Sequence, residues 1–524
     1  MTADTASPPD SLANRAERLE AAMARRVWLW VLPLAAMARL PGLMTRPLWY
    51  DEAFAALFSS KGPLAMLRGT LAVESGVAAD VHPLLYYSLL WLWQKAFGAS
   101  PVSVRMLSVI FGLAVVVLGV VLARRLFDER AAVWAGMLLA LSSFQVHYSQ
   151  EARMYALLAF WLLLATALLW RALHSCSPWN WIGFALAAAA AQYTHNLAFC
   201  YLLALAVVAA LAGGWRGALR TLLAGAGTVL LYLPWLIRLP LQLARIEQGY
   251  WIQAPGAADI VRTLLVFVAG LPVAEEVLPA VVAATVLAIA VAAMPSLRAW
   301  RSGDPRAGRV GWVSGLATLP VLVMFAVSQW RPVYLDRALL PAGTMFLLWL
   351  AWALRRGSLS RALRLTAALG LLVALLLGLW GTYAYRGFPY APYPLLTDYL
   401  RSNLAPGERI VHSNKITALP AVYYGPGLPH HYIADPPGSG SDTLARATQE
   451  VLGLLADADA AEAAGGAPGV WFVIFPREIE EYRALGVAEH PALAWLSGHY
   501  RFGAELEFGE VRLYHFVLPE GNEE

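Results

Sequence analysis

The chain of 524 residues is 59% hydrophobic and only 14% charged, which excludes an ordinary soluble globular protein. Its net charge of +4 does not indicate nucleic-acid binding, because Lys and Arg occur in short clusters between apolar runs rather than on one face. The two cysteines, Cys176 and Cys200, have no spacing typical of a disulfide framework or a zinc site. The composition therefore predicts a polytopic α-helical membrane protein.

The N-terminal segment is polar and of mixed charge, and the apolar stretch after it lacks a small-residue cleavage pattern. We therefore expect a cytoplasmic tail, residues 1–26, and a retained first span rather than a cleaved signal peptide. Runs of roughly 18 to 22 apolar residues can cross a bilayer core of about 30 Å as helices. About eleven such runs occur, near 27–44, 102–123, 131–148, 154–172, 179–195, 196–213, 219–239, 277–294, 310–329, 337–354 and 364–384.

Lys and Arg in short loops favour the cytoplasmic side of a membrane, so the basic clusters indicate the orientation of these spans. With about eleven spans, the clusters at 124–130, 215–220, 298–309 and 355–364 fall on one side. The segment 82–98 is also apolar enough to cross, but a crossing there would turn the arginine-bearing loops outward. Its Trp and Tyr side chains suit the headgroup level. We therefore predict an interfacial helix at this segment, an N-terminus in the cytoplasm and a multi-pass protein of the plasma membrane.

From about residue 385 the composition becomes that of a soluble domain. Segments 407–414, 469–475 and 508–517 have the pattern of strands, and helical patterns lie between them. The sequence therefore predicts a transmembrane domain, 27–384, followed by an extracytoplasmic α/β domain, 385–524. The glycine-rich loops of the second domain lack the spacing that cradles a phosphate, so we assign it no catalytic motif.

Two adjacent acids, Asp51 and Glu52, follow the first predicted span in the sequence LWYDEAF. Acids in a loop are usually solvated, but these two are flanked by aromatic residues and lie next to the membrane. Moving a carboxylate toward the hydrocarbon core costs up to about 2.5 to 3.5 kcal/mol, so a pair of acids at this position favours a functional role. Repulsion between adjacent carboxylates also favours proton uptake by one of them, as a general base requires.

Three further outer loops carry polar groups. The loop HYSQEARMY holds Glu151 and Arg153, which either neutralise one another in a hairpin or take part in a site. His195 in the short turn QYTHN lies at the membrane boundary, where a lone histidine is more often structural. Arg331 and Arg337 precede or begin a predicted span, and outward arginines favour an anionic partner such as a lipid phosphate. The convergence of acids, histidines and arginines from four loops on one face indicates a functional site there.

Five motifs occur in a fixed order: LWYDEAF, HPLLYYSLLWLWQKAFGASPVSVRMLSVIFGLAVV, SQEARMYALL, YTHN and RALLPA. Their order resembles that of bacterial membrane glycosyltransferases of the GT-C class, similar to the protein O-mannosyltransferase and aminoarabinose (lipid A) transferase group. The resemblance covers about residues 27–384 and implies a GT-C-like helical fold with interfacial helices in the first outer loop. The C-terminal domain is a less diagnostic appendage.

The resemblance also implies roles for single residues. Asp51 matches the catalytic acid of the family, Glu52 is its neighbour, and Glu151 matches the acid of the second loop. The candidate contacts to a donor phosphate are Arg153, Arg337, Arg331 and Lys61, and the candidate contacts to substrate are His82, Tyr86, Tyr155 and His195.

Enzymes of this class transfer a sugar from a polyprenyl-phosphate carrier to an acceptor hydroxyl, and the resemblance implies the same here, with a lipid, glycan or protein as acceptor. A phosphate leaving group needs cationic stabilisation rather than a general acid. The acceptor hydroxyl gains about 10² to 10⁴ in rate from a positioned base, for which we choose Asp51. No second carboxylate is needed as a nucleophile, so we expect inversion at the anomeric carbon. No cofactor is required, and a divalent cation on Asp51 and Glu151 stays open as an alternative.

Two other classes of protein also fit a polytopic chain. A transporter or flippase of lipids or sugars should have ionisable or helix-breaking residues at mid-span. Here the centres of the spans are almost purely apolar and the polar groups cluster at one face. This favours catalysis at the membrane surface over transport, with a non-catalytic assembly protein as the third interpretation.

Overall fold

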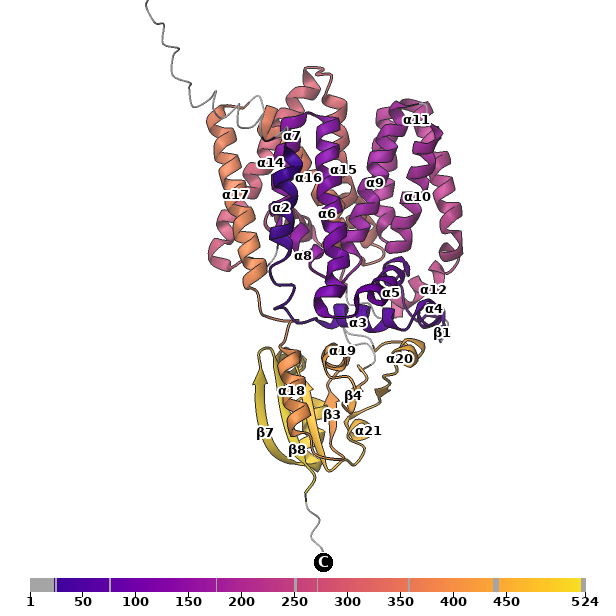
Figure 1. The fold of residues 1–524 in the computed structure, drawn as a ribbon, viewed down its shortest axis with the longest axis vertical. Coiled ribbons are helices and arrows are strands. Elements are labelled where there is room, and N and C mark those ends of the chain that lie inside the picture. Colours follow the sequence, from indigo (N-terminus) through magenta and orange to yellow (C-terminus); the bar gives the residue numbers. More distant parts are fainter. Residues whose placement is uncertain are drawn as a thin grey trace, which may run out of the picture.

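The computed structural model describes residues 23, 26–74, 77–175, 177–248, 252–270, 272–356, 359–436 and 443–519. Within these ranges, a bundle of long helices forms one part of the molecule and a sheet with flanking helices forms the other (Figure 1). The predicted tail, residues 1–26, lies outside the described residues except for Met23 and Arg26.

The bundle contains helices of different length, most of them roughly parallel in Figure 1. They are α2 (Val27–Arg39), α6 (Pro101–Leu126), α7 (Glu129–Leu141), α8 (Ser143–Ser149), α9 (Tyr155–His174), α10 (Pro178–Thr194), α11 (Ala198–Leu236), α14 (Leu278–Arg301), α15 (Ala307–Ser328), α16 (Leu340–Arg356) and α17 (Arg361–Ala384). In the part of the chain that the structure describes, 7 helical segments are long and apolar enough to cross a membrane. The chain is therefore a multi-pass membrane protein, as predicted.

Two predicted runs lie in one element, α11, whose Gly214 is not helical and has a φ of 60° and a ψ of −166°. The Tyr193 hydroxyl on α10 donates to Leu231 O at 3.1 Å. The hydroxyl of Thr228 donates to Ala185 O at 3.4 Å. The second half of α11 therefore runs beside α10 in the same direction, and the chain reverses at Gly214. Glycine suits this reversal because it adopts a positive φ without a Cβ clash.

The third predicted run divides at Ser142, where α7 ends and α8 begins. Ser142 Oγ accepts a hydrogen bond from Gln145 N and so caps the start of α8. Arg39, fully buried at the end of α2, donates to Leu139 O and Ala140 O, two of the carbonyls that the end of α7 leaves free. The break thus places a short helix, α8, across the bundle. With α2 shorter than its predicted run and α10 only 17 residues long, the count of about eleven spans stays a prediction.

The segment between α2 and α6 forms short elements at the lower end of the bundle in Figure 1: α3 (Tyr50–Ser60), α4 (Pro63–Leu71), β1 (Val73–Glu74), β2 (Val77–Ala78) and α5 (Leu85–Phe97). The predicted interfacial helix at 82–98 corresponds to α5. Its 13 residues extend over about 20 Å, which is less than the bilayer core of about 30 Å. The length of α5 therefore agrees with a helix that does not cross. Further short elements are α12 (Leu239–Gln248), α13 (Ala257–Ala269), η1 (Glu275–Val277) and η2 (Asp336–Leu339).

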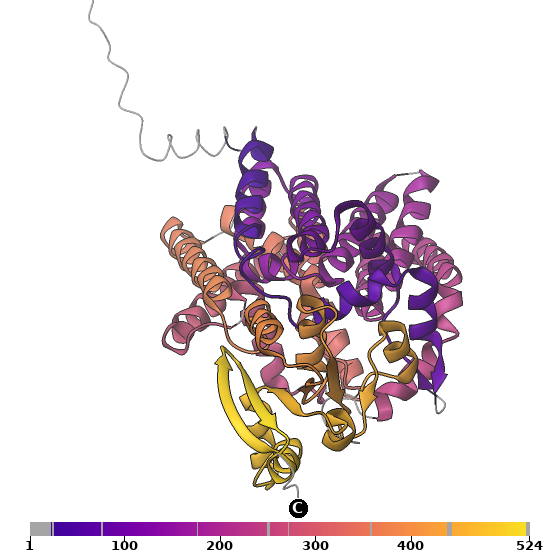
Figure 2. The same cartoon turned by 60° about the horizontal axis from the view of Figure 1, so that its bottom comes forward.

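The C-terminal domain is built on a 6-stranded mixed sheet in the order β5-β4-β3-β6-β8-β7. Its elements are α18 (Tyr393–Asn403), β3 (Arg409–His412), α19 (Lys415–Tyr424), β4 (His430–Ile433), α20 (Arg446–Leu452), β5 (Ala456–Asp457), α21 (Ala460–Ala464), β6 (Gly469–Ile474), α22 (Pro476–Ala484), α23 (Pro491–His499), β7 (Arg501–Phe508) and β8 (Val511–Val517). Strands β5, β4, β3 and β6 are parallel, while β8 and β7 are antiparallel and form one edge, drawn in yellow in Figure 2. Every residue of β6 is buried, as expected for a strand covered on both faces.

The C-terminal domain contacts the end of the bundle through two of its helices. Helix α19, which follows β3, packs against α3, and α20 packs against α4 (Figure 1). The Lys415 ammonium lies 5.8 Å from the ring centroid of Tyr50, and the Tyr424 hydroxyl accepts a hydrogen bond from Leu48 N at 2.9 Å. The carboxyl end of β3 therefore faces the bundle next to the first turn of α3, which carries Asp51.

Candidate active site

The two adjacent acids of α3 have different surroundings, although both lie in the first turn of the helix. Glu52 is fully buried, and its two oxygens accept from Arg105 Nε at 2.7 Å and Arg105 Nη2 at 2.6 Å. The backbone amide of Ala152 donates to the same carboxylate at 2.9 Å. Both oxygens are thus occupied by the protein. These contacts hold α3 in place, and the catalytic role of Glu52 stays a prediction.

Arg105 extends this network from α6 to the segment that precedes α3. Its remaining N–H groups donate to Leu43 O at 3.1 Å, Arg46 O at 2.6 Å and Pro47 O at 3.0 Å. One buried guanidinium therefore fixes the approach of the chain to α3 as well as the helix itself. Because Asp51 precedes Glu52, the same network fixes the position of the Asp51 backbone. The sequence analysis missed Arg105, although a charged residue within an apolar run was a signal for it.

Asp51 lies between two arginines that come from distant parts of the chain. Its Oδ2 is 3.6 Å from Arg153 Nε and 3.6 Å from Arg337 Nη1. The Arg337 guanidinium stacks over the ring of Tyr155 at 5.2 Å, and Arg153 Nη1 donates to the Tyr87 hydroxyl at 3.2 Å. Burial by itself lowers the pKa of Arg153, but the attraction of Asp51 outweighs it and the net direction is upward. The cluster therefore brings two guanidiniums, groups that can bind an anion, to the Asp51 carboxylate.

Glu151 forms a second buried acidic group beside this cluster. Its Oε1 is 3.2 Å from His147 Nε2, while its Oε2 is buried without a hydrogen-bond partner. Burial acts to raise the pKa of Glu151, but His147, Arg337 and Arg153 outweigh burial and hold the pKa below its ordinary value. Glu151 is therefore ionised at neutral pH, with one oxygen that makes no bond to the protein.

The predicted substrate contacts His82 and His195 lie next to Tyr155. The ring of His195 is 5.9 Å from that of His82 and 5.9 Å from that of Tyr155, measured between centroids. His82 Nδ1 is 2.9 Å from Asp80 Oδ1. The pKa of His195 lies well below its ordinary value, first because of burial and then because of His82 and the two arginines. His195 is therefore a neutral ring at the border of the cluster.

Three of the predicted site residues lie away from the cluster. Tyr86 is fully buried and its hydroxyl is 3.3 Å from Ser108 Oγ on α6, so its neighbour Tyr87 reaches Arg153 in its place. Lys61 is exposed at the far end of α3, about 15 Å along the helix from Asp51. Arg331 is exposed in the segment after α15. The structure therefore places Tyr86, Lys61 and Arg331 outside the Asp51 cluster, and their roles as substrate and phosphate contacts stay predictions.

The arrangement does not fit a divalent cation held by Asp51 and Glu151. Asp51 faces two guanidiniums and Glu151 faces His147 and the same arginines, so positive charge already surrounds both carboxylates. Among the described residues, no three His, Cys, Asp or Glu side chains lie close enough together to hold a metal ion.

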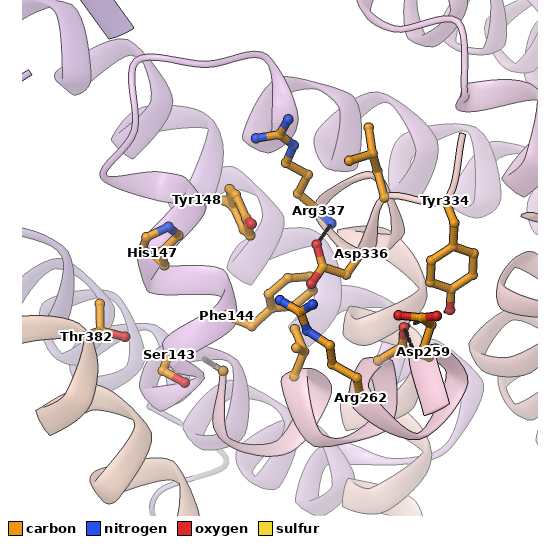
Figure 3. A pocket seen from close by; sticks show the side chains of 14 residues that line it. Ser143, Phe144, His147, Tyr148, Asp259, Arg262, Tyr334, Asp336, Arg337 and Thr382 are labelled. Atoms are coloured by element: carbon orange, nitrogen blue, oxygen red, sulfur yellow. Dashed lines mark hydrogen bonds between the residues drawn. The ribbon is translucent and has the colours of Figure 1, made fainter. Parts of the chain in front are cut away.

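A cavity of about 280 Å³ adjoins this cluster (Figure 3). It is lined by Ser143, Phe144, His147 and Tyr148 of α8, by Asp259, Arg262, Thr263, Val266 and Gly270 at α13, by Tyr334, Leu335, Asp336 and Arg337, and by Thr382 of α17. Arg337 and His147 belong to both places, since the first pairs with Asp51 and the second with Glu151. The acids, arginines and cavity thus form one continuous candidate active site at the end of the bundle that the C-terminal domain covers.

The fold is that of solved membrane glycosyltransferases of the GT-C class. The crystal structure of ArnT from Cupriavidus metallidurans in the apo state is similar with a TM-score of 0.59 at 15% identity, over 95% of this chain and 98% of that one. ArnT bound to undecaprenyl phosphate gives a TM-score of 0.56 at 14% identity, over 96% and 98%. The archaeal oligosaccharyltransferase AglB from Archaeoglobus fulgidus, in complex with an inhibitory peptide and a dolichol-phosphate, gives 0.54 at 15% identity, over 94% and 74%.

The family model described as dolichyl-phosphate-mannose-protein mannosyltransferase matches residues 81–238. No curated protein matches the sequence. The matched family and the similar structures are glycosyltransferases, so the resemblance that the order of the motifs indicates is confirmed.

Proposed function

We propose that this chain is an integral-membrane inverting glycosyltransferase that moves a sugar from a polyprenyl-phosphate carrier to an acceptor hydroxyl. The observation that carries the proposal is the Asp51 carboxylate between Arg153 and Arg337. A lipid-phosphate donor is supported by the match to the mannosyltransferase family model and by the similar folds of ArnT with undecaprenyl phosphate and AglB with a dolichol-phosphate.

Arg153 and Arg337 bind the donor phosphate in this proposal. Each of the two guanidiniums can make charge-assisted hydrogen bonds to phosphate oxygens. Both side chains are already held in place, Arg337 over the ring of Tyr155 and Arg153 by the Tyr87 hydroxyl. Preorganised cations stabilise the charge that develops on the leaving phosphate without a cost of reorganisation.

Asp51 acts as the general base. It takes the proton of the acceptor hydroxyl as the acceptor oxygen bonds to the anomeric carbon, while the bond from that carbon to the phosphate oxygen breaks and its electron pair stays on the phosphate. Both oxygens of Glu52 are bound by Arg105, and because the phosphate leaves without protonation, the proposed reaction needs no covalent intermediate on a second carboxylate. A single displacement therefore inverts the configuration of the sugar.

The acceptor in this proposal is a lipid, glycan or protein that reaches the site at the end of the bundle under the C-terminal domain. The positive-inside pattern supports a cytoplasmic tail at residues 1–26, a membrane domain at 27–384 and an extracytoplasmic domain at 385–524 in the plasma membrane. Both the donor and a large acceptor can then approach one surface, the donor from the bilayer and the acceptor from the aqueous side.

The substitution Asp51→Asn tests the general base. Purified protein is incubated with radiolabelled polyprenyl-phosphate sugars and a panel of hydroxyl acceptors. We expect transfer to fall by about 10²- to 10⁴-fold, because the amide cannot take the proton. The exposed Asp398, paired with Arg401 in the C-terminal domain, gives the matched control Asp398→Asn, which should transfer sugar as the wild type does. Equal transfer by Asp51→Asn and the wild type would exclude Asp51 as the base.

A second arm of this experiment addresses the transporter or flippase alternative. The same protein is reconstituted in vesicles that hold the radiolabelled donor, and movement of the lipid across the bilayer is measured. We expect no flux above that of empty vesicles. Flux without transfer to any acceptor would favour the transporter over the glycosyltransferase.

A further inference from the structure

The cavity beside Arg337 shares a wall with the Asp51 cluster. Arg337 lines the cavity and pairs with Asp51 at 3.6 Å. Tyr148 also lines it, and its ring packs at 5.3 Å against that of Tyr155, over which the Arg337 guanidinium lies. In Figure 3 the guanidinium of Arg337 points away from Arg262, so Arg337 lies at the border between the cavity and the Asp51 cluster. A ligand in the cavity would therefore lie next to any group that Arg337 binds.

The lining offers both donors and acceptors of hydrogen bonds from separate elements. Asp259 and Arg262 come from α13, and Asp336 comes from η2. Asp259 Oδ2 accepts from Gly256 N at 2.8 Å, which leaves Oδ1 for a ligand. His147 is fixed through one ring nitrogen by Glu151, so its second ring nitrogen has a defined direction. Carboxylates that accept and a guanidinium that donates suit the vicinal hydroxyl groups of a sugar.

The apolar part of the lining and the volume narrow the ligand further. Phe144, Tyr148 and Tyr334 present aromatic rings, against which the C–H face of a sugar ring can pack. A volume of about 280 Å³ lies at the lower end of ligand sites, which hold drug-sized molecules at about 300 to 1,000 Å³. The cavity therefore fits one sugar ring rather than an oligosaccharide, and its charged lining does not suit a lipid chain.

We propose that this cavity holds the sugar of the donor, one monosaccharide unit bound through its hydroxyl groups, and that Asp259 and Arg262 determine which sugar is accepted. The proposal rests on the proposed function, because it takes Arg337 as a ligand of the donor phosphate. A single oxygen atom joins that phosphate to the anomeric carbon, so the site of the sugar must border the site of the phosphate. The cavity meets this condition at Arg337. Asp259 and Arg262 lie outside residues 81–238, which the family model matches.

Binding of undecaprenyl phosphate with and without a sugar tests the proposal in the full-length protein in nanodiscs. We expect the wild type to bind the sugar-bearing lipid more tightly than the bare lipid phosphate. Asp259→Asn and Arg262→Gln should each lower the affinity for the sugar-bearing lipid by about tenfold or more, because each removes a hydrogen-bonding charge. Their affinity for bare undecaprenyl phosphate should not change. Val261→Ala, at an exposed position of the same helix, is the matched control and should keep both affinities.

Three results would overturn the proposal. The first is that both variants still prefer the sugar-bearing lipid as the wild type does, or that the wild type itself shows no preference between the two lipids. The second is that the variants lose affinity for bare undecaprenyl phosphate, which would place the phosphate in the cavity. The third is a higher KM for the acceptor alone, which would place the acceptor there. Arg262→Gln removes no helix-capping bond and decides the matter if Asp259→Asn lowers the melting temperature.

The proposed function fails by a different result. If the wild type prefers the sugar-bearing lipid in the binding experiment but transfers no sugar to any acceptor, the sugar site is supported and the transferase activity is rejected. If the wild type transfers sugar and both variants keep its preference for the sugar-bearing lipid, the transferase activity is supported and the sugar site is rejected.

Discussion

Two acidic clusters of this molecule handle their charges in opposite ways. In the C-terminal domain, Glu478 Oε2 accepts from Ser413 Oγ at 2.6 Å and from Asn414 Nδ2 at 2.9 Å. The other oxygen, Oε1, is 3.3 Å from His490 Nε2. This carboxylate has a partner for each oxygen, and all three partners come from the end of β3 and the segment after α22.

In the Asp51 cluster at the end of the bundle, the carboxylate oxygens do not all have hydrogen-bond partners. Asp51 is 3.6 Å from each of two arginines, beyond the usual range of a hydrogen bond, and Glu151 keeps one buried oxygen without a partner. Buried polar groups in folded proteins are nearly always satisfied, so the exceptions concentrate at sites that bind something else. The contrast indicates that the Glu478 cluster stabilises the C-terminal domain, whereas the Asp51 cluster has the character of a ligand-binding site.

The largest effect on stability is expected from Glu52→Gln. Removal of one partner leaves the Arg105 guanidinium buried without a counter-charge, which should lower the free energy of unfolding by about 3 to 5 kcal/mol. Thermal unfolding in detergent measures this loss. The double variant Glu52→Gln with Arg105→Gln should lose less than the sum of the two single variants. A melting temperature like that of the wild type would show that the pair does not fix α3.

Arg153→Gln should act mainly on catalysis. Loss of one preorganised cation should lower the rate of sugar transfer by about 10²- to 10³-fold, with a smaller loss of stability than Glu52→Gln because its contact to Asp51 is long. The transfer rate and the melting temperature are measured on the same preparation. If stability falls as far as in Glu52→Gln while transfer is kept, the Asp51 cluster belongs with the structural one.

Glu478→Gln should act on stability rather than on catalysis or lipid binding. Loss of the charged acceptor should lower the stability of the C-terminal domain by about 1.5 to 3 kcal/mol and leave the affinity for undecaprenyl phosphate unchanged. Thermal unfolding and lipid binding separate the two effects. Weaker lipid binding at an unchanged melting temperature would make the Glu478 cluster a second functional site.

The stability of the C-terminal domain is also expected to depend on pH. Burial lowers the pKa of His430 from 6.5 to about 4. Because the folded state binds the proton less well than the unfolded chain, stability should decrease as the pH falls from 6.5 toward 4 and level off below that. His430→Gln should flatten this part of the profile, measured by thermal unfolding. A profile that Glu478→Gln flattens equally would contradict the assignment to His430.

The sequence predicted the helices of the bundle well because each apolar run is an extended local signal. The break between α7 and α8 depends on Ser142, one serine in an apolar run, together with Arg39 more than 100 residues away, and no local pattern contains that contact. In the sheet, the three predicted strands correspond to β3, β6 and β8. Strand β5 has 2 residues and β7 is mostly exposed, so neither gives a strong hydrophobic pattern.

The site was predicted by residue type rather than by partner. The sequence indicated that acids and arginines from separate loops converge, and the structure brings Asp51, Arg153 and Arg337 together. The choice between Asp51 and Glu52 required the position of Arg105, and the choice between Tyr86 and Tyr87 required the rotation of α5. Adjacent residues of a helix face directions about 100° apart, so neither choice is contained in the spacing of the motifs.

Helix α3 is contacted by both halves of the molecule, by Arg105 of α6 on one side and by α19 of the C-terminal domain on the other. A chain ending near residue 385 would strip α3 of its second neighbour and uncover the ring of Tyr50, which Lys415 adjoins. The C-terminal domain thus supports the helix that carries the acid, and its loss would reach the candidate active site through α3.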